Sequence, residues 1–434
     1  MTNIAERLLA RVVDVRREEI GAMLWSFLYF FFLLAAYYVI RPVRDEMAVQ
    51  FGAHNLQRLF TATFLAMVVA IPIFGALAAR LPVNRLLPTV YVFFAACLAG
   101  FHFALDAGIT KRALAPYFFV WVSVFNLFVV SVFWSFMADF FDTAAARRLF
   151  GFISAGGSLG AVAGPTITAV LAAQLGISNL LLVSALLLGA AIICIFMLLR
   201  ISARRGDAAR FLRTGGEGAE KPSRGGGRPS LWVGVVALAR SPYLLGIGVF
   251  LLCYTLLSTL LYYQQTALVP LAIASPEERT RLFAVVDFAV NTLTLALQFF
   301  ATGRLLTRFG LVAMLAALPA FNVAGFLALS AATILPTLVV FGVLRRAGEF
   351  AITKPARETL FTVVTKEEKY QAKNVIDTVV YRGGDAASSW VAAGLQAAGL
   401  SLSGMALFGA PVALLWLAVA LFVGRRHEAM RRAS

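Results

Sequence analysis

The sequence has few charged residues for its length. Of its 434 residues, 14% are Asp, Glu, Lys or Arg, whereas 60% are hydrophobic. Soluble globular domains carry about 25% charged and about 45–50% apolar residues. The shortage of charge therefore excludes an ordinary soluble domain and predicts a protein embedded in lipid.

Histidine and cysteine are also scarce. The chain has three histidines, far apart in sequence, and three cysteines, each inside an apolar run. No HExxH zinc motif, GxSxG nucleophile elbow or Cys/His pair is present. The sequence therefore predicts no enzyme, no cofactor and no metal site.

Long apolar runs are what the chain has in quantity. A membrane-spanning helix needs about 20 mostly apolar residues, and open sheet edges cannot face lipid. We expect an all-α polytopic membrane protein with about 12 transmembrane helices in two six-helix halves. The predicted spans are 23–43, 59–79, 86–105, 115–138, 149–173, 180–199, 243–264, 282–302, 310–331, 333–352, 375–397 and 404–424.

A stretch rich in Gly, Arg and Ser separates the sixth run from the seventh. Its composition is typical of a flexible linker. The expected organisation is an amphipathic N-terminal segment at 1–22, a first half at 23–200, a basic linker at 201–242, a second half at 243–424 and a tail at 425–434.

Basic residues are distributed unevenly among the predicted loops. With the N-terminus inside, the inner loops hold 28 Lys and Arg and the outer loops hold seven. Because positive charge accumulates on the cytoplasmic side, we expect a bacterial inner-membrane protein with both termini in the cytoplasm and lipids around it. The same bias explains the net charge of +16. Nucleic acid is not an expected partner, since the charges lie between apolar runs and form no basic stripe.

The first span ends with an unusual group of charges. Arg41, Arg44 and Asp45 stand within an apolar register that continues to about Val49. One interpretation is a solvated helix end; the favoured one is a wet cavity, because charge at membrane depth is expensive and usually functional. Arg41 and Arg44 are three residues apart, so they lie near one face of the helix. Guanidinium groups bind phosphate oxygens bidentately, which predicts substrate binding at both.

Charged residues also stand inside later spans. Asp287 and Asn291 lie one turn apart in the eighth span, and the tenth carries Arg345, Arg346 and Glu349. Arg345 and Glu349 are four apart and could pair along the helix. We expect substrate binding by Arg346, Arg357 and Asn291, and charge coupling or gating by the carboxylates and Arg382. The members of this second set are Asp45, Asp287, Glu349, Asp377, Arg382 and Asp385.

Glycines recur at intervals of four in the fifth span. Gly156, Gly160 and Gly164 form a small-residue stripe of the kind that lets two helices approach closely. A phosphate-binding glycine loop is the alternative, but the G-K-[ST] ending is missing and no strand precedes it. Helix packing is therefore the favoured interpretation.

The two halves repeat one short motif. Gly75-x-Leu-x-x-Arg80 follows the second span, and Gly303-x-Leu-x-x-Arg308 follows the eighth. Close approach of two helices at the glycine, and an arginine that anchors the cytoplasmic end of the span, would explain the pattern. This placement resembles major facilitator transporters, which are built from six-helix repeats with the binding site at the bilayer midplane.

Four further motifs are spread along nearly the whole chain. In order they are Arg41-x-x-Arg44-Asp45; Phe133-Trp134 with Ala146-Arg147-Arg148; Asp287-Phe288 with Arg308-Phe309-Gly310; and Pro355-Ala-Arg357-Glu-Thr with Lys369-x-x-x-Lys373-x-x-Ile376-Asp377-x-Val379 and Gly383-Gly384. Together they resemble the ATP/ADP translocase family, the nucleotide transporters of plastids and obligate intracellular bacteria. The resemblance implies a major facilitator-like fold and counter-exchange of nucleotides.

Residue by residue, the resemblance places Arg44 and Arg357 where the family has lysines that bear on transport, and Asp287 on a family aspartate. The family's glutamates in the fourth and seventh spans are absent; the seventh span has Ser258 instead. We expect an ATP:ADP antiporter or a relative with another anionic substrate. Its two halves would rock around Arg44 and Arg357.

Two other functions remain open. One is a proton-coupled major facilitator exporter of another solute, with Asp287, Glu349 or Asp139 as the titrating carboxylate. The other is a membrane protein that handles lipid and transports nothing.

Overall fold

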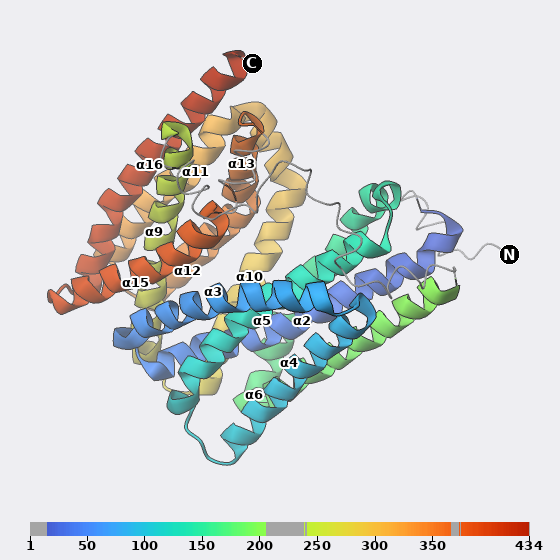
Figure 1. The fold of residues 1–434 in the computed structure, drawn as a ribbon. Coiled ribbons are helices and arrows are strands. Elements are labelled where there is room, and N and C mark those ends of the chain that lie inside the picture. Colours follow the sequence, from blue (N-terminus) through green and yellow to red (C-terminus); the bar gives the residue numbers. More distant parts are fainter. Residues whose placement is uncertain (1–14, 205–237, 239–240, 366–372, 374, 434) are drawn as a thin grey trace. The chain divides into compact units, whose positions relative to one another are not determined.

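The computed structural model describes residues 15–204, 238, 241–365, 373 and 375–433. Helices account for nearly all of these residues, and no β-sheet occurs among them (Figure 1). The predicted all-α polytopic fold is confirmed. The predicted N-terminal segment falls largely on 1–14 and the predicted linker largely on 205–237, both outside the described residues.

The helices follow the predicted spans closely. In chain order they are α2 (Ile20–Phe51), α3 (Leu56–Arg80), α4 (Val83–Asp106), α5 (Lys111–Phe140), α6 (Thr143–Arg204), α9 (Pro242–Ala272), α10 (Pro276–Leu297), α11 (Gly303–Ala331), α12 (Leu335–Gly348), α13 (Lys354–Thr359), α15 (Tyr381–Ala397) and α16 (Leu402–Ala433). Within the described ranges, eight helical stretches are long and apolar enough to cross a membrane.

Two of these eight stretches each supply two spans. Helix α6 has 62 residues, so a straight version would be about 93 Å long, against about 30 Å for the hydrocarbon core. Gly176 (φ 74°) interrupts it, and Gly310 (φ 75°) interrupts α11 in the same way. Glycine tolerates this left-handed conformation because it has no Cβ. Gly176 falls in the loop predicted between 173 and 180, whereas Gly310 is the first residue of the predicted span 310–331.

Three π-helical segments lie in the second part of the chain. They are η3 (Gln298–Thr302), η4 (Glu349–Thr353) and η6 (Ile376–Val380). Segment η4 lies between α12 and α13, and η6 precedes α15. Such wide turns are rare and are frequent at functional sites. The tenth and eleventh predicted spans, 333–352 and 375–397, therefore each contain an irregular segment.

The chain forms two compact units, which we describe separately. Unit 1 takes in the described residues of Met1–Phe51, Leu65–Glu220 and Ser275–Phe288. Unit 2 takes in those of Gly52–Phe64, Lys221–Ala274 and Ala289–Ser434. The first part of α10 therefore belongs to unit 1, together with α2.

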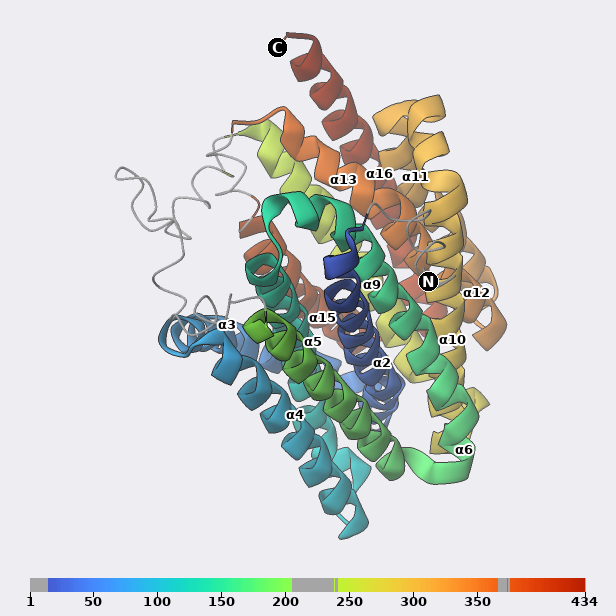
Figure 2. The same cartoon turned by 90° about the vertical axis from the view of Figure 1, so that its right-hand side faces the viewer.

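Unit 1 is organised around the contact between α2 and α6, which run side by side in both ribbon views (Figures 1 and 2). A Cβ on Gly156 would lie 2.4 Å from the Phe27 carbonyl oxygen, and one on Gly160 would lie 2.3 Å from that of Phe31. Backbone at this distance leaves no room for a side chain. The predicted packing role of the glycine stripe is confirmed.

Unit 2 is organised around α9, which packs against α15 and α16. Its core is also aromatic: Trp416 is fully buried and lies 5.3 Å from Phe250 and 5.9 Å from Tyr254 between ring centroids. Gly384 of α15 faces the hydroxyl of Thr255 on α9. Here the close approach is to a side chain, whereas in unit 1 it is to backbone.

The repeated G-x-L-x-x-R motif has a different basis from the one we expected. A Cβ placed on Gly75 or on Gly303 would have no heavy atom within 4 Å. Close helix approach therefore does not explain these two glycines, and that part of the prediction is wrong.

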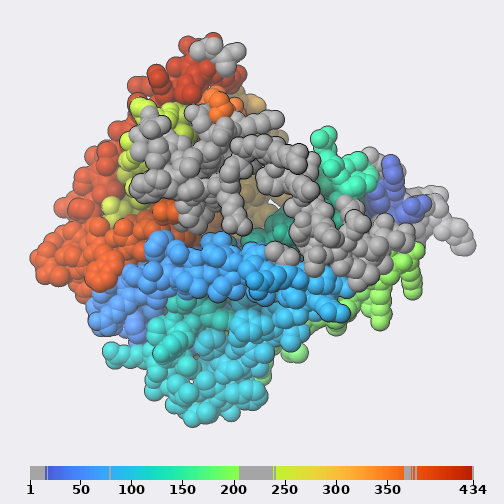
Figure 3. Space-filling model, in the orientation of Figure 1, coloured from blue at the N-terminus to red at the C-terminus, as the bar shows by residue number. Residues whose placement is uncertain are grey.

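The outer surface of α3 and α4 is apolar. Leu65, Val69 and Phe93 are each more than half exposed. The two helices that carry them are drawn in shades of blue in the space-filling view (Figure 3). Water-exposed patches of this kind are rare on monomeric soluble proteins. They are expected of a surface in contact with lipid chains.

Candidate functional site

The charges at the end of the first span lie inside the helix. Helix α2 continues to Phe51, and it holds Arg41, Arg44, Asp45 and Glu46 in its interior. Asp45 is 5% exposed and Glu46 is fully buried. This agrees with the prediction that the helix does not end before these charges.

Arg41 is bound by a carboxylate from a distant part of the chain. Its Nη1 donates to Asp287 Oδ1 of α10 at 3.0 Å, and Asp287 is 1% exposed. The guanidinium also lies 5.7 Å from the ring centroid of Tyr38. Unit 1 thus brings together one predicted substrate-binding residue and one predicted coupling residue.

Arg44 has other partners. Its Nη2 and Nε donate to Asp45 Oδ1 at 2.8 and 3.2 Å, and its guanidinium lies 5.0 Å from the ring centroid of Phe119 on α5. Arg41 and Arg44 therefore share a helix, but each is engaged by its own carboxylate.

A buried ion pair was missed by the sequence interpretation. Arg279, at the start of α10, donates from Nε and Nη2 to the two carboxylate oxygens of Glu46 at 2.8 and 2.7 Å. Their side chains are 8% and 0% exposed. The sequence assigns Arg279 to an outer loop; a carboxylate in the apolar register of the first span was the signal that a cation would meet it.

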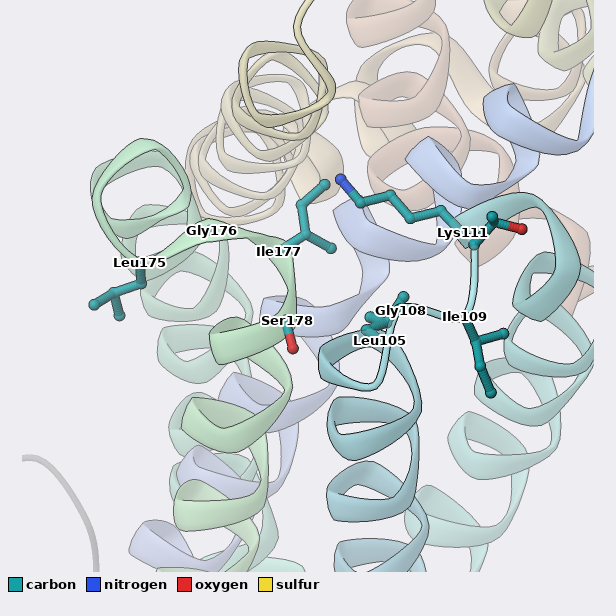
Figure 4. A pocket seen from close by; sticks show the side chains of 9 residues that line it. Leu105, Gly108, Ile109, Lys111, Leu175, Gly176, Ile177 and Ser178 are labelled. Atoms are coloured by element: carbon teal, nitrogen blue, oxygen red, sulfur yellow. The ribbon is translucent and has the colours of Figure 1, made fainter.

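The ion pairs between α2 and α10 continue towards the surface of unit 1. Lys111 at the start of α5 donates to Glu277 at 3.3 Å, and both side chains are about one third exposed. Lys111 also lines a pocket of about 400 Å³ with Gly108, Gly176 and Ser178 (Figure 4). This pocket contains none of the predicted substrate residues.

Unit 2 holds a second charge cluster, centred on Arg345 of α12. Arg345 is 3% exposed and donates to Asn322 Oδ1 at 2.9 Å, to Ser258 Oγ at 2.5 Å and to the Tyr254 carbonyl at 3.3 Å. Its guanidinium also lies 5.0 Å from the Tyr254 ring centroid. The suggested pairing with Glu349 is wrong, because these neutral groups on α9 and α11 take the hydrogen bonds instead.

Ser258 has a particular place in this arrangement. It stands where the resemblance puts a glutamate in the seventh span, and it accepts a hydrogen bond from Arg345. A serine hydroxyl satisfies the donor but carries no charge. The positive charge of Arg345 is therefore not neutralised by a bonded carboxylate.

Arg357 is a further buried cation of unit 2. It lies on α13 and is 6% exposed. In the part of the chain that the structure describes, its guanidinium makes no hydrogen bond or ion pair. Glu349, at the start of η4, is 4% exposed and within electrostatic range of both Arg345 and Arg357.

The other predicted residues of unit 2 are placed as follows. Arg382 lies 3.9 Å from Asp385 and 5.5 Å from the ring centroid of Tyr381. Asn291 is 9% exposed, and Arg346 is partly buried. Asp377 belongs to η6, but its side chain lies outside the described residues.

A metal site is not formed by the described residues. No group of three His, Cys, Asp or Glu among them is close enough to hold a metal ion. The charge clusters consist of arginines, which can bind anions, and of carboxylates, which can accept hydrogen bonds from arginines or take up protons.

Comparison with known proteins identifies the fold family. A family model described as Major Facilitator Superfamily matches residues 26–275. No curated protein sequence matches the chain.

Similar solved structures cover nearly the whole chain. One is the POT family transporter PepTSo (TM-score 0.63, 11% identity, 94% of this chain and 98% of that chain). Another is a bacterial homologue of the iron transporter ferroportin in an inward-facing state (TM-score 0.63, 14% identity, 94% and 98%). A third is a mutant of the nucleoside transporter NupG (TM-score 0.52, 13% identity, 95% and 100%).

The structural likenesses show the fold, and the family model covers more than half of the chain. The chain therefore belongs to the Major Facilitator Superfamily and is a multi-pass membrane transporter of that type.

Proposed function

We propose that the protein transports an anionic organic phosphate, with ATP and ADP as the first candidates, by alternating access. The observation that carries this proposal is the state of Arg357. It is 6% exposed and makes no hydrogen bond or ion pair with any described residue. A buried guanidinium without a bonded acceptor is unfavourable, and a bound anion would supply the acceptor.

The charge balance of unit 2 supports an anionic substrate. Among the described residues of this unit, Arg345 and Arg357 are buried cations and Glu349 is the one buried carboxylate. Arg345 is held by neutral groups only. The surplus of positive charge inside an apolar unit favours a ligand that carries negative charge.

Arginine is well suited to bind phosphate groups. The guanidinium is planar, always charged and able to donate two parallel hydrogen bonds to phosphate oxygens. The resemblance to ATP/ADP translocases assigns Arg357 and Arg44 to positions that bear on transport, which supports a nucleotide as the phosphate compound. The expected process is antiport of one nucleotide against another, with the substrate bound by arginines and no cofactor involved.

Alternating access also requires a contact that opens and closes. The ion pairs of Arg41 with Asp287 and of Arg279 with Glu46 join α2 to α10, helices of the first and second six spans. We place the latch for one membrane face there. Replacing Glu46 and Arg279 together by Met should change the maximal uptake rate and leave the substrate affinity unchanged; an altered affinity with the same rate would contradict this assignment.

The test of the proposed function is uptake of radiolabelled ATP into proteoliposomes that contain the purified protein, with and without internal ADP. Uptake that depends on internal ADP is expected. Arg357→Ala should lower it about 10- to 100-fold, the equivalent of one lost hydrogen-bonded charge contact. The matched control is Arg426→Ala, because Arg426 is exposed near the end of α16.

Two results would contradict the proposal. One is the absence of ATP, ADP or sugar-phosphate uptake by a protein that is folded and inserted. The other is unchanged uptake in Arg357→Ala. The first would direct attention to a proton-coupled exporter of another solute.

A further inference from the structure

A pocket of unit 1 is built from residues that the proposed function does not use. It has a volume of about 400 Å³ and lies where the end of α4, the start of α5 and the Gly176 break of α6 meet (Figure 4). All of its lining residues belong to unit 1. Its volume falls within the range of small-molecule sites, about 300–1,000 Å³.

One wall of the pocket is held in place by polar contacts. The Oγ atom of Ser178, at the start of the second part of α6, lies 2.9 Å from His102 Nδ1 of α4. The same ring nitrogen lies 3.2 Å from the Ser178 carbonyl oxygen. These contacts tie α4 to α6 beside the pocket, so the wall is fixed before a ligand arrives. A pre-formed site binds its ligand at a smaller entropic cost.

The donors of the pocket are a cation and a hydroxyl group. In Figure 4 the Lys111 side chain extends from the start of α5 towards Ile177. Its ammonium group has three N–H donors, and one of them contacts Glu277 at 3.3 Å. The Thr110 side-chain oxygen accepts from the Ala113 backbone at 3.3 Å, so its own O–H can donate elsewhere. With these donors and no carboxylate among its lining residues, the pocket suits an anionic group.

The rest of the lining is mostly apolar and partly faces outwards. Leu105, Ile109, Leu175 and Ile177 contribute aliphatic side chains. Ile109 is 47% and Leu175 is 40% exposed, and Figure 4 shows these two side chains on opposite sides of the pocket. Exposed apolar side chains on membrane-spanning helices are expected to contact lipid chains. The pocket thus combines basic and apolar parts, which an amphiphilic anion would match.

We propose that this pocket binds the headgroup of an anionic phospholipid such as phosphatidylglycerol. The headgroup phosphate accepts hydrogen bonds from Lys111 and Thr110, and an acyl chain lies along Ile109 or Leu175. A soluble phosphate has no apolar part to cover these side chains, so the lipid is the better match. The site is separate from the arginines assigned to the transported anion, and the inference does not depend on the proposed function.

The lipid competes with the Lys111–Glu277 ion pair. Both side chains are about one third exposed, so the pair contributes little and is inexpensive to break. Glu277 keeps the Ser275 hydroxyl as a donor at 3.0 Å when the lysine turns to the phosphate. Glu277 lies two residues before Arg279, which pairs with Glu46 of α2. A bound lipid therefore acts at the start of α10, next to the ion pair that joins this helix to α2.

The experiment places the purified full-length protein in phosphatidylcholine nanodiscs that contain a small fraction of phosphatidylglycerol with a photoactivatable group near its headgroup. After illumination, labelled peptides are identified by mass spectrometry. Labels concentrated on 105–111 and 175–178 are expected. Labels spread evenly over the lipid-facing helices would overturn the inference, and this measurement needs no variant.

Two charge variants test the lysine. Lys111→Gln should lower labelling of the pocket about fivefold, the effect of one basic residue on an anionic lipid at a membrane surface. The matched control is Arg112→Gln, because Arg112 is exposed and does not line the pocket. Its labelling should stay close to that of the wild type. Equal losses in the two variants would indicate general attraction to basic residues and would overturn the site.

The competition with Glu277 predicts a change of opposite sign. Glu277→Gln releases Lys111 and should raise labelling about two- to fivefold, the equivalent of one surface ion pair. The double variant Lys111→Gln/Glu277→Gln should lose this increase, since the carboxylate acts through the lysine. An increase that persists in the double variant would show that Glu277 only repels the lipid, and would overturn the competition.

A soluble competitor identifies the source of the phosphate. Glycerol 3-phosphate in large excess offers the same phosphate chemistry without an acyl chain, and it should leave the labelling unchanged. Loss of labelling in its presence would show that the pocket takes a soluble phosphate, and would overturn the assignment to a lipid.

Discussion

The buried arginines of the two compact units have different kinds of partner. In unit 1 each buried or partly buried arginine of the α2–α10 region has a carboxylate within hydrogen-bond distance. The pairs are Arg41–Asp287, Arg44–Asp45 and Arg279–Glu46. In unit 2, Arg345 is bonded to neutral groups, and Arg357 has no hydrogen-bonded partner among the described residues.

The difference distinguishes buried charges that stabilise the fold from buried charges that a ligand could neutralise. A balanced pair compensates its own desolvation, so it needs nothing from outside. An unbalanced guanidinium carries a desolvation penalty that a ligand can remove, and that penalty becomes a source of affinity for anions. In unit 1 the pairs Arg41–Asp287 and Arg279–Glu46 join α2 to α10, and under our proposal the charges of unit 2 bind the substrate.

The largest expected effect comes from breaking a balanced pair. Arg279→Met would leave the fully buried Glu46 without its cation and should lower the free energy of unfolding by about 3–5 kcal/mol. Replacing both Glu46 and Arg279 by Met should recover most of this loss, since no charge remains buried. The free energy of unfolding of the wild type, of Arg279→Met and of the double variant is measured by titrating a denaturing detergent into mixed micelles.

The control for that measurement is Lys111→Met. The Lys111–Glu277 pair is about one third exposed, so its loss should change stability by less than about 1 kcal/mol. If Arg279→Met and Lys111→Met behave alike, the idea that unit 1 stores buried, balanced charge is wrong.

An unbalanced arginine should be less costly to remove. Arg345→Met leaves Asn322, Ser258 and a backbone carbonyl without a donor, but no buried charge without a partner. We expect a loss of about 1–3 kcal/mol, below that of Arg279→Met in the same unfolding assay. A loss larger than that of Arg279→Met would show that Arg345 is in fact balanced by an acid.

The close helix contacts at glycine can also be compared between unit 1, where the glycine meets backbone, and unit 2, where it meets a side chain. In Gly160→Ala the new Cβ would lie 2.3 Å from the Phe31 carbonyl oxygen, which cannot move without shifting α2, so we expect a loss of about 1–3 kcal/mol. Gly384→Ala should lose less, because its nearest atom is the Thr255 hydroxyl, which can rotate. Gly151→Ala, with no atom within 4 Å, is the control and should be neutral or slightly stabilising. Equal losses at Gly160 and Gly384 would contradict the distinction.

The smallest expected effect concerns an ion pair outside the membrane spans. Glu19 accepts from Arg148 at 2.9 and 3.2 Å. Burial alone would raise the pKa of Glu19, but the hydrogen bonds from Arg148 and from the Arg16 backbone outweigh it, so the pKa lies below its ordinary value of 4.5.

Because the folded pKa of Glu19 is lowered, the stability that this group contributes is present above about pH 4.5 and is lost as the pH falls through the lowered value. The melting temperature of Glu19→Gln should therefore lie slightly below that of the wild type near neutral pH. The two should converge in acid. A difference that grows as the pH falls would have the wrong sign.

Much of the fold could be predicted from apolar run lengths, because about 20 apolar residues have few alternatives to a spanning helix. The loop at Gly176 was placed correctly by the same reasoning, and the break at Gly310 falls on the first residue of a predicted span. The stripe of Gly156, Gly160 and Gly164 was interpreted correctly because small residues at intervals of four share a helix face. The π-helical segments were not predicted, since one extra residue in a turn leaves no mark in composition.

The candidate site was predicted less completely. Sequence reasoning found Arg41, Asp287 and Arg357, because charge inside an apolar run is conspicuous. It suggested a pair between Arg345 and Glu349 from their spacing alone, and it left Arg279 in a loop. Both errors have one cause: spacing along a helix shows which residues are neighbours on that helix, but not what another helix presents to them.

The sequence by itself determined that this chain is helical, spans a membrane many times and carries rare charges within its spans, because hydrophobic run length and helix periodicity are local properties. Only the tertiary structure decided which charges are neutralised. Arg41 and its partner Asp287 are 246 residues apart, and the tertiary fold brings α2 and α10 close enough for them to form an ion pair. The same packing physics left Arg345 and Arg357 beside neutral groups and a single carboxylate, and that is where we place the chemistry of transport.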